Sequence, residues 1–346
     1  MVSIAQLLAF LGLDYHNESI QVCVLDAAGK VLGNRSLPND VDAVVAFVEQ
    51  VAPGHVIQGG AVEACCGAAN FAERLRAIGW NIDLAHAGLC SRMKQNPDKT
   101  DLTDAHLLAD LVRIGYLPRV WLPPREIRDL RRLVRYRQQL VERRRNTKLR
   151  MRAMLREERI QVPADAGNVW TKGWLAWLRT TTALGSHSRW VMDRHLASLD
   201  QIIVEIREVE QRMEQATHDD AVTQQLLAEK GVGLVTAVTL RAEIGSFARF
   251  QSGKQLARYC AVTPKNASSG ARQADAGLIR AGNLPLRSLL IEAGHRLCRY
   301  VPRWQQMKQH LLARGKPAGV IAAAVVNRWV RQLHWKIQSL NTTVAA

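Results

Sequence analysis

Residues 8–37, LAFLGLDYHNESIQVCVLDAAGKVLGNRSL, decide the fold of the first part of the chain. The segment begins with an apolar run that ends in LGLDYH, and SIQVCVLD follows with nearly alternating apolar residues. A turn at residues 27–30, which contains glycine, then leads into VLGNRSL. We therefore expect three consecutive strands that form a meander.

Alternating helices and strands follow the meander. Residues 40–52 predict a helix opened by an Asp cap, and HVIQGGAVEA predicts a fourth strand. AANFAERLRAIG predicts a helix that ends at Gly79, NIDLAHA a fifth strand, and residues 94–117 a further helical stretch. This order indicates an α/β domain over residues 1–122, which two prolines close.

The composition changes after these prolines. Residues 125–160 hold 14 Lys and Arg against 5 Asp and Glu, which is more than half of the chain's net charge of +16 in about a tenth of its length. Ile127, Leu130, Val134 and Val141 recur at helical spacing, so we expect one long basic amphipathic helix. Such clustered charge favours a polyanionic partner, most commonly nucleic acid. The expected nucleic-acid-binding residues are Arg131, Arg132, Arg135, Arg143, Arg144, Arg145, Lys148 and Arg152.

A second long helix is predicted after a Trp-rich segment. Its apolar residues step by three and four, which is a heptad seam: they are Leu199, Ile202, Ile206, Val209, Met213 and Ala216. Because a single helix with such a seam is unstable when exposed, we expect a partner. That partner is either the 125–160 helix in an antiparallel hairpin or a second chain in a dimer or tetramer. Residues 123–219 are thus predicted to form a basic coiled-coil region.

The third region, residues 220–346, is predicted to be mostly α-helical. Gly231 and Gly233 form a tight turn between two helices, as in a helix-hairpin-helix element, whose turn amides often meet a DNA phosphate. A purely structural connector is the alternative. A polar loop rich in Ser and Gly follows between helical segments, and residues 319–340 predict a closing amphipathic helix.

Composition excludes several classes of protein. Hydrophobic residues make up 47% and charged residues 23%, which excludes wholesale disorder. There is no run of about 18 uncharged apolar residues, and the first residues have neither a basic segment nor a cleavage site, so neither a membrane span nor a signal peptide is predicted. None of the six cysteines forms a CxxC pair or a zinc-binding spacing. We expect buried free thiols in a cytoplasmic, nucleoid-associated bacterial protein.

Four carboxylates are candidates for catalysis. Asp14 ends one apolar strand and Glu63 another, while Asp101 and Asp104 lie three residues apart and share a helix face. Carboxylates from separate elements suit a site for two Mg²⁺ ions, which can clamp both oxygens of a phosphodiester exchange. Singly, each has a structural alternative: Asp14 as a turn residue, Glu63 as an acid at a helix start, and Asp101 as an N-cap.

These motifs match a family. The order LGLD, VEACCGA and KTDLTDA resembles the DEDD transposases of the insertion sequence 110 family, relatives of the Piv DNA invertases. GVGLVTAVTLRAEIGSF, LARYCAVTPKNASSG and GNLPLRSLLIEA extend the resemblance over nearly the whole chain. The family often has a small residue and Lys after the first Asp, whereas Tyr15 and His16 follow here, and Cys65-Cys66-Gly67 replaces a Gly-rich stretch.

The resemblance implies a RuvC-like, RNase H-fold catalytic domain and Mg²⁺ or Mn²⁺ held by Asp14, Glu63, Asp101 and Asp104. It also implies a nucleophilic serine, aligned as Ser269 with Ser268 as its neighbour, in a C-terminal transposase domain. A turn serine is the structural alternative. Members of this family use a non-coding bridge RNA that pairs with donor and target DNA. The implied function is an insertion-sequence transposase that recombines DNA.

Two other functions stay open. A Holliday-junction nuclease would use the carboxylates and water without the serine, and a basic coiled-coil scaffold would bind nucleic acid without cutting it. A sugar-kinase-like ATPase is disfavoured because no Gly-rich phosphate loop follows Asp14.

Overall fold

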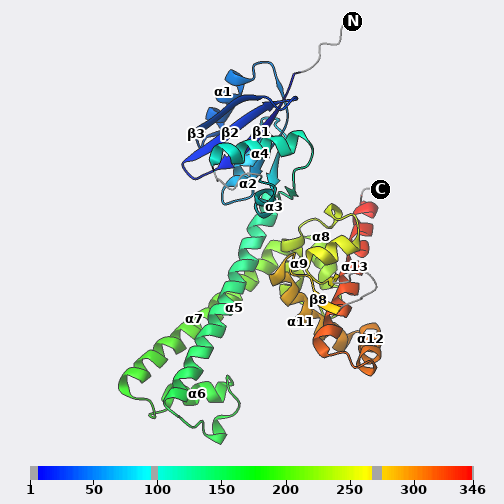
Figure 1. The fold of residues 1–346 in the computed structure, drawn as a ribbon. Coiled ribbons are helices and arrows are strands. Elements are labelled where there is room, and N and C mark those ends of the chain that lie inside the picture. Colours follow the sequence, from blue (N-terminus) through cyan, green and yellow to red (C-terminus); the bar gives the residue numbers. More distant parts are fainter. Residues whose placement is uncertain (1–6, 95–99, 267–274, 345–346) are drawn as a thin grey trace. The chain divides into compact units, whose positions relative to one another are not determined.

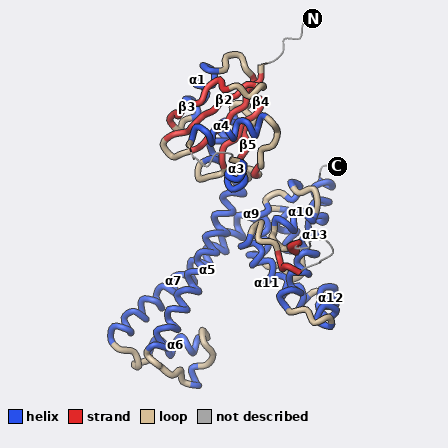
Figure 2. The backbone as a smooth tube through the Cα atoms, viewed as in Figure 1, coloured by secondary structure: helices blue, strands red, loops and turns tan. Residues whose placement is uncertain are grey.

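The computed structural model describes residues 7–94, 100–266 and 275–344. The chain divides into two compact units, residues 1–123 and 124–346. Figure 1 traces the two units along the chain, and Figure 2 shows that the first holds a sheet whereas the second is mostly helical.

The first unit is built on a mixed sheet with the order β3-β2-β1-β4-β5-β6. The first three strands form the predicted antiparallel meander. Strands β4 and β5 run parallel in the same direction as β1, and a short antiparallel β6, which was not predicted, completes the sheet. The strands are β1 (Leu8–Tyr15), β2 (Ser19–Asp26), β3 (Val31–Pro38), β4 (Val56–Glu63), β5 (Ile82–Ala85) and β6 (Arg119–Val120).

Helices cover both faces of this sheet. Because successive side chains of a strand point to opposite faces, Leu11 and Leu13 of β1 join the core beneath α1 and α2. Cys23 and Leu25 of β2 instead pack against Ala105 in helix α4, which crosses the opposite face (Figure 1). The helices are α1 (Val41–Val51), α2 (Ala68–Ala77), α3 (Ala87–Met93) and α4 (Asp101–Arg113), and Asp40 caps α1 as predicted.

Two long helices dominate the start of the second unit. Helix α5 (Arg125–Glu157) is the predicted basic helix, and helix α7 (Ser186–Thr217) carries the heptad seam. The first part of α5 packs against the last part of α7, whereas Met151 and Leu155 near the end of α5 meet Met192 and Leu196 near the start of α7. The two helices therefore form an antiparallel hairpin, and α6 (Lys172–Thr180) packs at its far end (Figure 1).

The hairpin answers one of the sequence predictions. Ile202, Ile206, Val209 and Met213 of the seam are buried against α5 of the same chain. The alternative of an intramolecular hairpin is thus confirmed. Of the seam residues, Ala216 is exposed. Assembly of the protein as a dimer or tetramer stays a prediction.

The remainder of the second unit is a helical bundle with one small hairpin. Strands β7 (Pro264–Asn266) and β8 (Asp275–Leu278) pair antiparallel, so the Ser/Gly-rich segment lies between strands and not between helices. The prediction missed this hairpin because such short strands show no periodic pattern. The helices are α8 (Ala221–Leu227), α9 (Leu234–Ile244), α10 (Gly253–Tyr259), α11 (Leu284–Tyr300), α12 (Pro302–Ala313) and α13 (Ala318–Val344).

The predicted turn between two helices is present in this bundle. Gly231 has a φ of 91° and lies between α8 and α9, where a side chain would be strained. Helix α13 closes the bundle as expected. Among the described residues, no helix has the length and apolar character needed to span a membrane.

Candidate active site on the sheet of the first unit

Asp14 and Glu63 lie at equivalent positions on adjacent parallel strands. Leu13 of β1 pairs with Val62 of β4, so each carboxylate follows immediately after this pair at the carboxyl end of its strand. Strand alternation puts both side chains on the face that α4 covers. The side chain of Asp14 is only 14% exposed, and a carboxylate placed there needs a compensating partner.

Helix α4 brings the second pair of acids to the same face. Thr100 caps the helix by accepting a hydrogen bond from the Thr103 amide, and Asp101 and Asp104 both lie in the first turn. Negative charge is favoured there by the helix dipole. The alternative role of Asp101 as the N-cap is therefore wrong, since Thr100 occupies that position. Asp104 is buried and Asp101 is exposed.

Gly12 sets how closely α4 approaches β1. A Cβ atom at residue 12 would lie 1.8 Å from the carbonyl oxygen of Ala105 and 2.5 Å from the amide nitrogen of Ala109. Real atoms do not approach so closely, so only glycine lets the helix backbone rest on this strand. The close approach brings the first turn of α4 towards the end of β1.

His16 connects the two elements. Its Nε2 atom lies 3.4 Å from Oδ2 of Asp14 and 3.4 Å from Oδ2 of Asp101. Hydrogen bonds hold the backbone of His16, whose amide donates to Ser19 and whose carbonyl oxygen accepts from the Asn39 side chain. The ligand atoms of Asp14, His16 and Asp101 all lie within 4.8 Å of one another. Carboxylate and imidazole are donors that divalent cations take, so this set fits a metal ion.

The other two predicted acids lie near this group but outside it. The Asp104 carboxylate forms an ion pair with Lys94, the residue that follows α3, and this ammonium group balances its buried charge. The negative charges of Glu63 and Asp14 are both close enough to the Cys65 thiol to raise its pKa. Burial raises the pKa of Cys65, and the charges of Glu63, Cys66 and Asp14 raise it further, against a backbone hydrogen bond. The side chains of Cys65 and Cys66 are exposed, so the expectation of buried thiols is wrong for these two cysteines.

Sequence reasoning missed His16 and Lys94. The Asp-x-His spacing at the end of β1 is a usable indication for His16, since both residues flank the same strand end. Lys94 offers no such pattern, because its pairing with Asp104 depends on how α3 and α4 meet in space.

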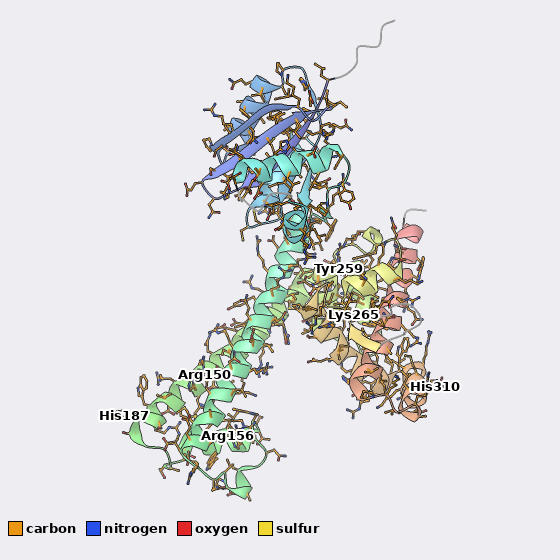
Figure 3. All side chains as sticks on the ribbon, viewed as in Figure 1. Arg150, Arg156, His187, Tyr259, Lys265 and His310 are labelled. Carbon is orange, nitrogen blue, oxygen red and sulfur yellow. The ribbon has the colours of Figure 1, made fainter. Side chains whose placement is uncertain are left out.

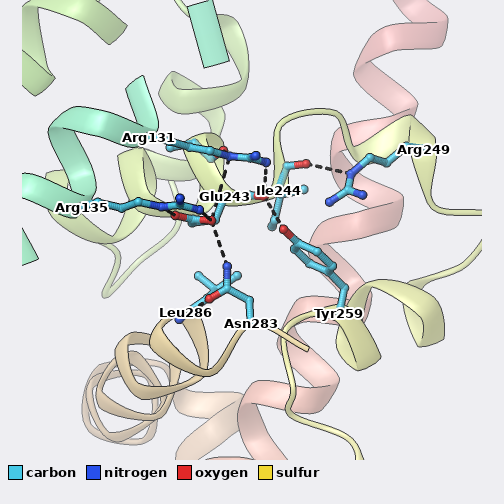
Figure 4. A network of polar contacts seen from close by, with 9 residues as sticks. Arg131, Arg135, Glu243, Ile244, Arg249, Tyr259, Asn283 and Leu286 are labelled. Carbon is cyan, nitrogen blue, oxygen red and sulfur yellow. Dashed lines mark hydrogen bonds and ion pairs between the residues drawn. The ribbon is translucent and has the colours of Figure 1, made fainter. Parts of the chain in front are cut away.

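The basic helix α5 divides its arginines between two tasks. Arg131 donates to the carbonyl oxygens of Ala242 and Glu243 at 2.7 and 3.0 Å. Arg135 donates to both carboxylate oxygens of Glu243 at 3.0 and 3.2 Å. Figure 4 shows these side chains converging on Glu243, which also accepts from Asn283. Arg131 and Arg135 therefore hold α5 to α9, and we omit them from the nucleic-acid surface proposed below.

The same network supports the segment that leads into α11. The Tyr259 hydroxyl donates to the carbonyl oxygen of Glu243. The Asn283 side chain caps α11, and the backbone amide of Asn283 donates to the carbonyl oxygen of Tyr259. Arg249 donates to Ile244 and lies over the rings of Phe250 and Tyr259 (Figure 4). Burial lowers the pKa of Arg131 and of Arg249, as expected for guanidinium groups removed from water.

We expect Glu243→Gln to lower the free energy of unfolding by about 2 kcal/mol. Removing one partner of a buried ion pair costs about 3–5 kcal/mol, and the 60% exposure of Arg135 reduces this because water can solvate its charge again. Urea denaturation would measure the loss. The matched control is Glu210→Gln, whose partner Arg137 is also on α5. The Glu210 side chain is 32% exposed against 8% for Glu243, so we expect less than about 1 kcal/mol there. Equal losses would contradict the role given to Glu243.

The other predicted basic residues lie further along α5. Arg132 pairs with Asp129, whereas Arg143, Arg144, Arg145, Lys148 and Arg152 make no ion pair with any acidic residue that the structure describes. Arg150 and Arg156 extend from the same part of the helix (Figure 3). Ser268 and Ser269 lie outside the described residues. The strands β7 and β8 on either side of them are described.

A mixed sheet with carboxylates at the ends of adjacent strands, followed by a basic helical region, is an arrangement that suits a DNA-processing enzyme. A family model for DEDD transposases of IS110 elements, described as "Transposase", matches residues 11–159. A second, described as "Transposase IS116/IS110/IS902 family", matches residues 223–309. The chain belongs to the IS110 family of transposases.

Relatives with curated descriptions agree. The chain is 30% identical over 267 residues to a putative transposase, y4qE, of Sinorhizobium fredii, in a match that covers 77% of this chain but 62% of that relative. It is 27% identical to a probable family 20 transposase of Pseudomonas aeruginosa over 97% of this chain and 98% of the relative. It is 25% identical to the transposase for insertion sequence element IS1111A of Coxiella burnetii, covering 84% and 78%.

Proposed function

We propose that this transposase cuts and rejoins DNA with a divalent metal site in residues 1–122 and a serine nucleophile in residues 220–346. The observation that carries the proposal is the group formed by Asp14, His16 and Asp101 at the end of β1. Glu63 and Asp104 complete the proposed carboxylate set on the same face of the sheet.

The donor set favours Mg²⁺ or Mn²⁺. Carboxylate oxygens suit Mg²⁺, and an imidazole nitrogen additionally suits Mn²⁺. A bound divalent cation supplies Lewis-acid stabilisation of charge on a phosphodiester. Asp14 and Asp101 would hold the ion, while Lys94 keeps the charge of Asp104 balanced inside the protein. The imidazole Nε2 of His16, which lies between these two carboxylates, would supply a third donor atom.

Ser269 is the proposed nucleophile. Attack by its hydroxyl on a phosphodiester would form a phosphoserine bond and release a DNA hydroxyl. Because the phosphoserine ester conserves the energy of the broken phosphodiester, the strands could be rejoined without ATP. A serine hydroxyl needs activation by a base or a metal. The support is the match of TPKNASSG to the family motif. The strands β7 and β8 pair antiparallel, and at their base the backbone amide of Ile279 donates to the carbonyl oxygen of Thr263.

Trapping the covalent intermediate tests the function. We expect a nicked or suicide DNA substrate to leave an adduct that peptide mass spectrometry places on Ser269. Ser269→Ala should give no adduct and no recombination while DNA binding is retained. Ser268→Ala is the matched control and should keep both activities.

The outcomes separate the alternatives. An adduct on Ser268 would move the nucleophile by one residue. Cleavage by Ser269→Ala without any adduct would favour the Holliday-junction nuclease. Binding without metal-dependent cleavage by the unaltered protein would favour the basic scaffold.

The exposed basic residues of α5 are proposed to bind nucleic-acid phosphates, in donor and target DNA and in a bridge RNA. Base pairing by that RNA would select the target sequence, as in other RNA-guided systems. The support is the group of cations on α5 that no described carboxylate neutralises. A structured RNA that copurifies with the protein would support guidance. Sequence-selective recombination without RNA would contradict it.

Neutralising three arginines should weaken the salt dependence of binding. We expect Arg143, Arg144 and Arg145, changed together to Gln, to lower the slope of log K against log salt by about 0.9 per lost duplex contact. Fluorescence anisotropy across a salt series measures the slope. The control changes the exposed Arg194, Arg207 and Arg212 of α7 and has the same change in net charge. If both triple variants lower the slope equally, only net charge matters.

A further inference from the structure

A small pocket on α5 combines positive charge with an aromatic ring. Its cations are Arg144, Arg145, Lys148 and Arg152, which follow one stripe of the helix. Val141 and Leu149 add apolar surface, and Trp170 from the segment before α6 closes the pocket. The volume is about 270 Å³, which is below the roughly 300–1,000 Å³ of sites for drug-sized ligands.

Trp170 is held in place by its surroundings. Its ring meets Trp174 edge-on at 4.6 Å, and Trp174 is buried in the core between α5, α6 and α7. The backbone of Trp170 has a φ of 73°, a left-handed conformation that is uncommon for a bulky residue. Such backbone conformations persist where the surrounding structure imposes them, and they cluster at ligand sites.

The charges of the pocket lack compensation within the described chain. Lys148 places its ammonium 4.6 Å from the centre of the Trp170 ring. Burial lowers the pKa of Lys148, and the neighbouring Arg144 lowers it further. No described carboxylate forms an ion pair with these four cations. Like charges crowded beside a half-buried ring favour an anion that also offers an apolar, flat surface.

We propose that this pocket binds one unpaired nucleotide of a single-stranded segment, with its base against Trp170 and its phosphates on Arg144, Arg145 and Arg152. The proposal rests on the proposed nucleic-acid binding by α5 and goes beyond it by naming the subsite and the form of the ligand. A base inside a duplex is stacked on both faces, so only an unpaired base can present its face to the indole. When the base binds, the Lys148 ammonium would leave the Trp170 ring and contact a phosphate instead.

Binding assays on the full-length protein test this subsite. The probes are a fluorescein-labelled single-stranded RNA of 20 nucleotides, the DNA strand of the same sequence and the corresponding DNA duplex. Because base–aromatic stacking accounts for about a tenfold difference in affinity, we expect Trp170→Leu to weaken single-strand binding by about that factor. Duplex binding should change by less than about twofold, and Trp170→Phe should restore most of the loss.

Trp190→Leu is the matched control. Trp190 is 64% exposed on α7 and also has a guanidinium, that of Arg194, near its ring, but it does not line the pocket that holds Trp170. The Trp190→Leu variant should bind the RNA strand, the DNA strand and the DNA duplex with unchanged affinity. If RNA responds more strongly than DNA to Trp170→Leu, the bound strand is RNA, and the reverse response identifies DNA.

A crosslinking measurement covers the case in which Trp170→Leu does not fold. Single strands that carry 5-iodouridine, irradiated with the unaltered protein, should form an adduct that mass spectrometry places on Trp170. Unchanged single-strand affinity in folded Trp170→Leu, equal losses for duplex and single strand, or adducts only elsewhere would overturn the proposal. Failure of the unaltered protein to bind any of the probes would instead refute the proposed function.

Discussion

Asp14→Asn is expected to reduce strand cleavage by about a thousandfold or more, while the fold and nucleic-acid affinity remain. The carboxylate lies in the group of possible metal ligands with His16 and Asp101, and an amide there removes one negative charge from the site. A thousandfold loss corresponds to about 4 kcal/mol of transition-state stabilisation. Asp104→Asn should act in the same direction, because its charge balances that of Lys94 beside the site. Cleavage of a labelled DNA substrate measures both effects.

Asp110→Asn is the matched control for these variants. Asp110 lies on α4 with Asp104 but pairs with Arg113, and it is not part of the group formed by Asp14, His16 and Asp101. We expect this variant to cut DNA within about threefold of the unaltered protein, since the Asp110–Arg113 pair is partly solvated and lies between neighbouring turns of one helix. Excess chelator should stop cleavage by the unaltered protein. Cleavage that continues in chelator, or in Asp14→Asn, would exclude the metal site.

Gly12→Ala should destabilise the first unit by about 3 kcal/mol or more and abolish cleavage. The added methyl would meet backbone atoms of Ala105 and Ala109 in α4, and a helix backbone cannot turn aside as a side chain does. Overpacking usually costs about 1–3 kcal/mol, and contact with backbone places this variant at or above that range. Displacing α4 would also move Asp101 away from Asp14. Denaturation monitored by circular dichroism, together with the cleavage assay, measures both consequences.

Gly59→Ala is the matched control. It shows whether the effect of Gly12→Ala comes from contact with the α4 backbone or from any alanine placed at a strand glycine. Gly59 is a strand glycine of β4 whose added Cβ would lie 3.1 Å from a methyl of Val112, also on α4. A side chain can shift by the few tenths of an ångström required, so we expect a change below about 1 kcal/mol. If Gly12→Ala is equally mild, the close approach of α4 does not position the site.

Sequence patterns identified most of the secondary structure because they act locally. The meander, the Asp40 cap and the long basic helix depend on neighbouring residues, through alternation, capping and helical spacing. Strands β6, β7 and β8 were missed because two to four residues are too few to show a period. The seam on α7 was recognised, but an apolar stripe does not state which helix covers it.

The arginines of α5 illustrate the same limit. Arg135 and Arg145 both lie in the same basic helix, and both were predicted to bind nucleic acid. Only the structure shows that Glu243, 108 residues further along the chain, pairs with Arg135. Arg145 faces a pocket together with Trp170, a residue that sequence reasoning had not singled out.

The sequence by itself determined which strands end in carboxylates and where positive charge gathers, because both follow from residue order within single elements. Tertiary structure alone decided which of these groups meet. His16 lies between Asp14 and Asp101 because the turn after β1 and the first turn of α4 come together above Gly12. Lys94 reaches Asp104 through the packing of α3 near α4. Such distances depend on how closely two backbones can pack, and no periodicity within one segment carries that information.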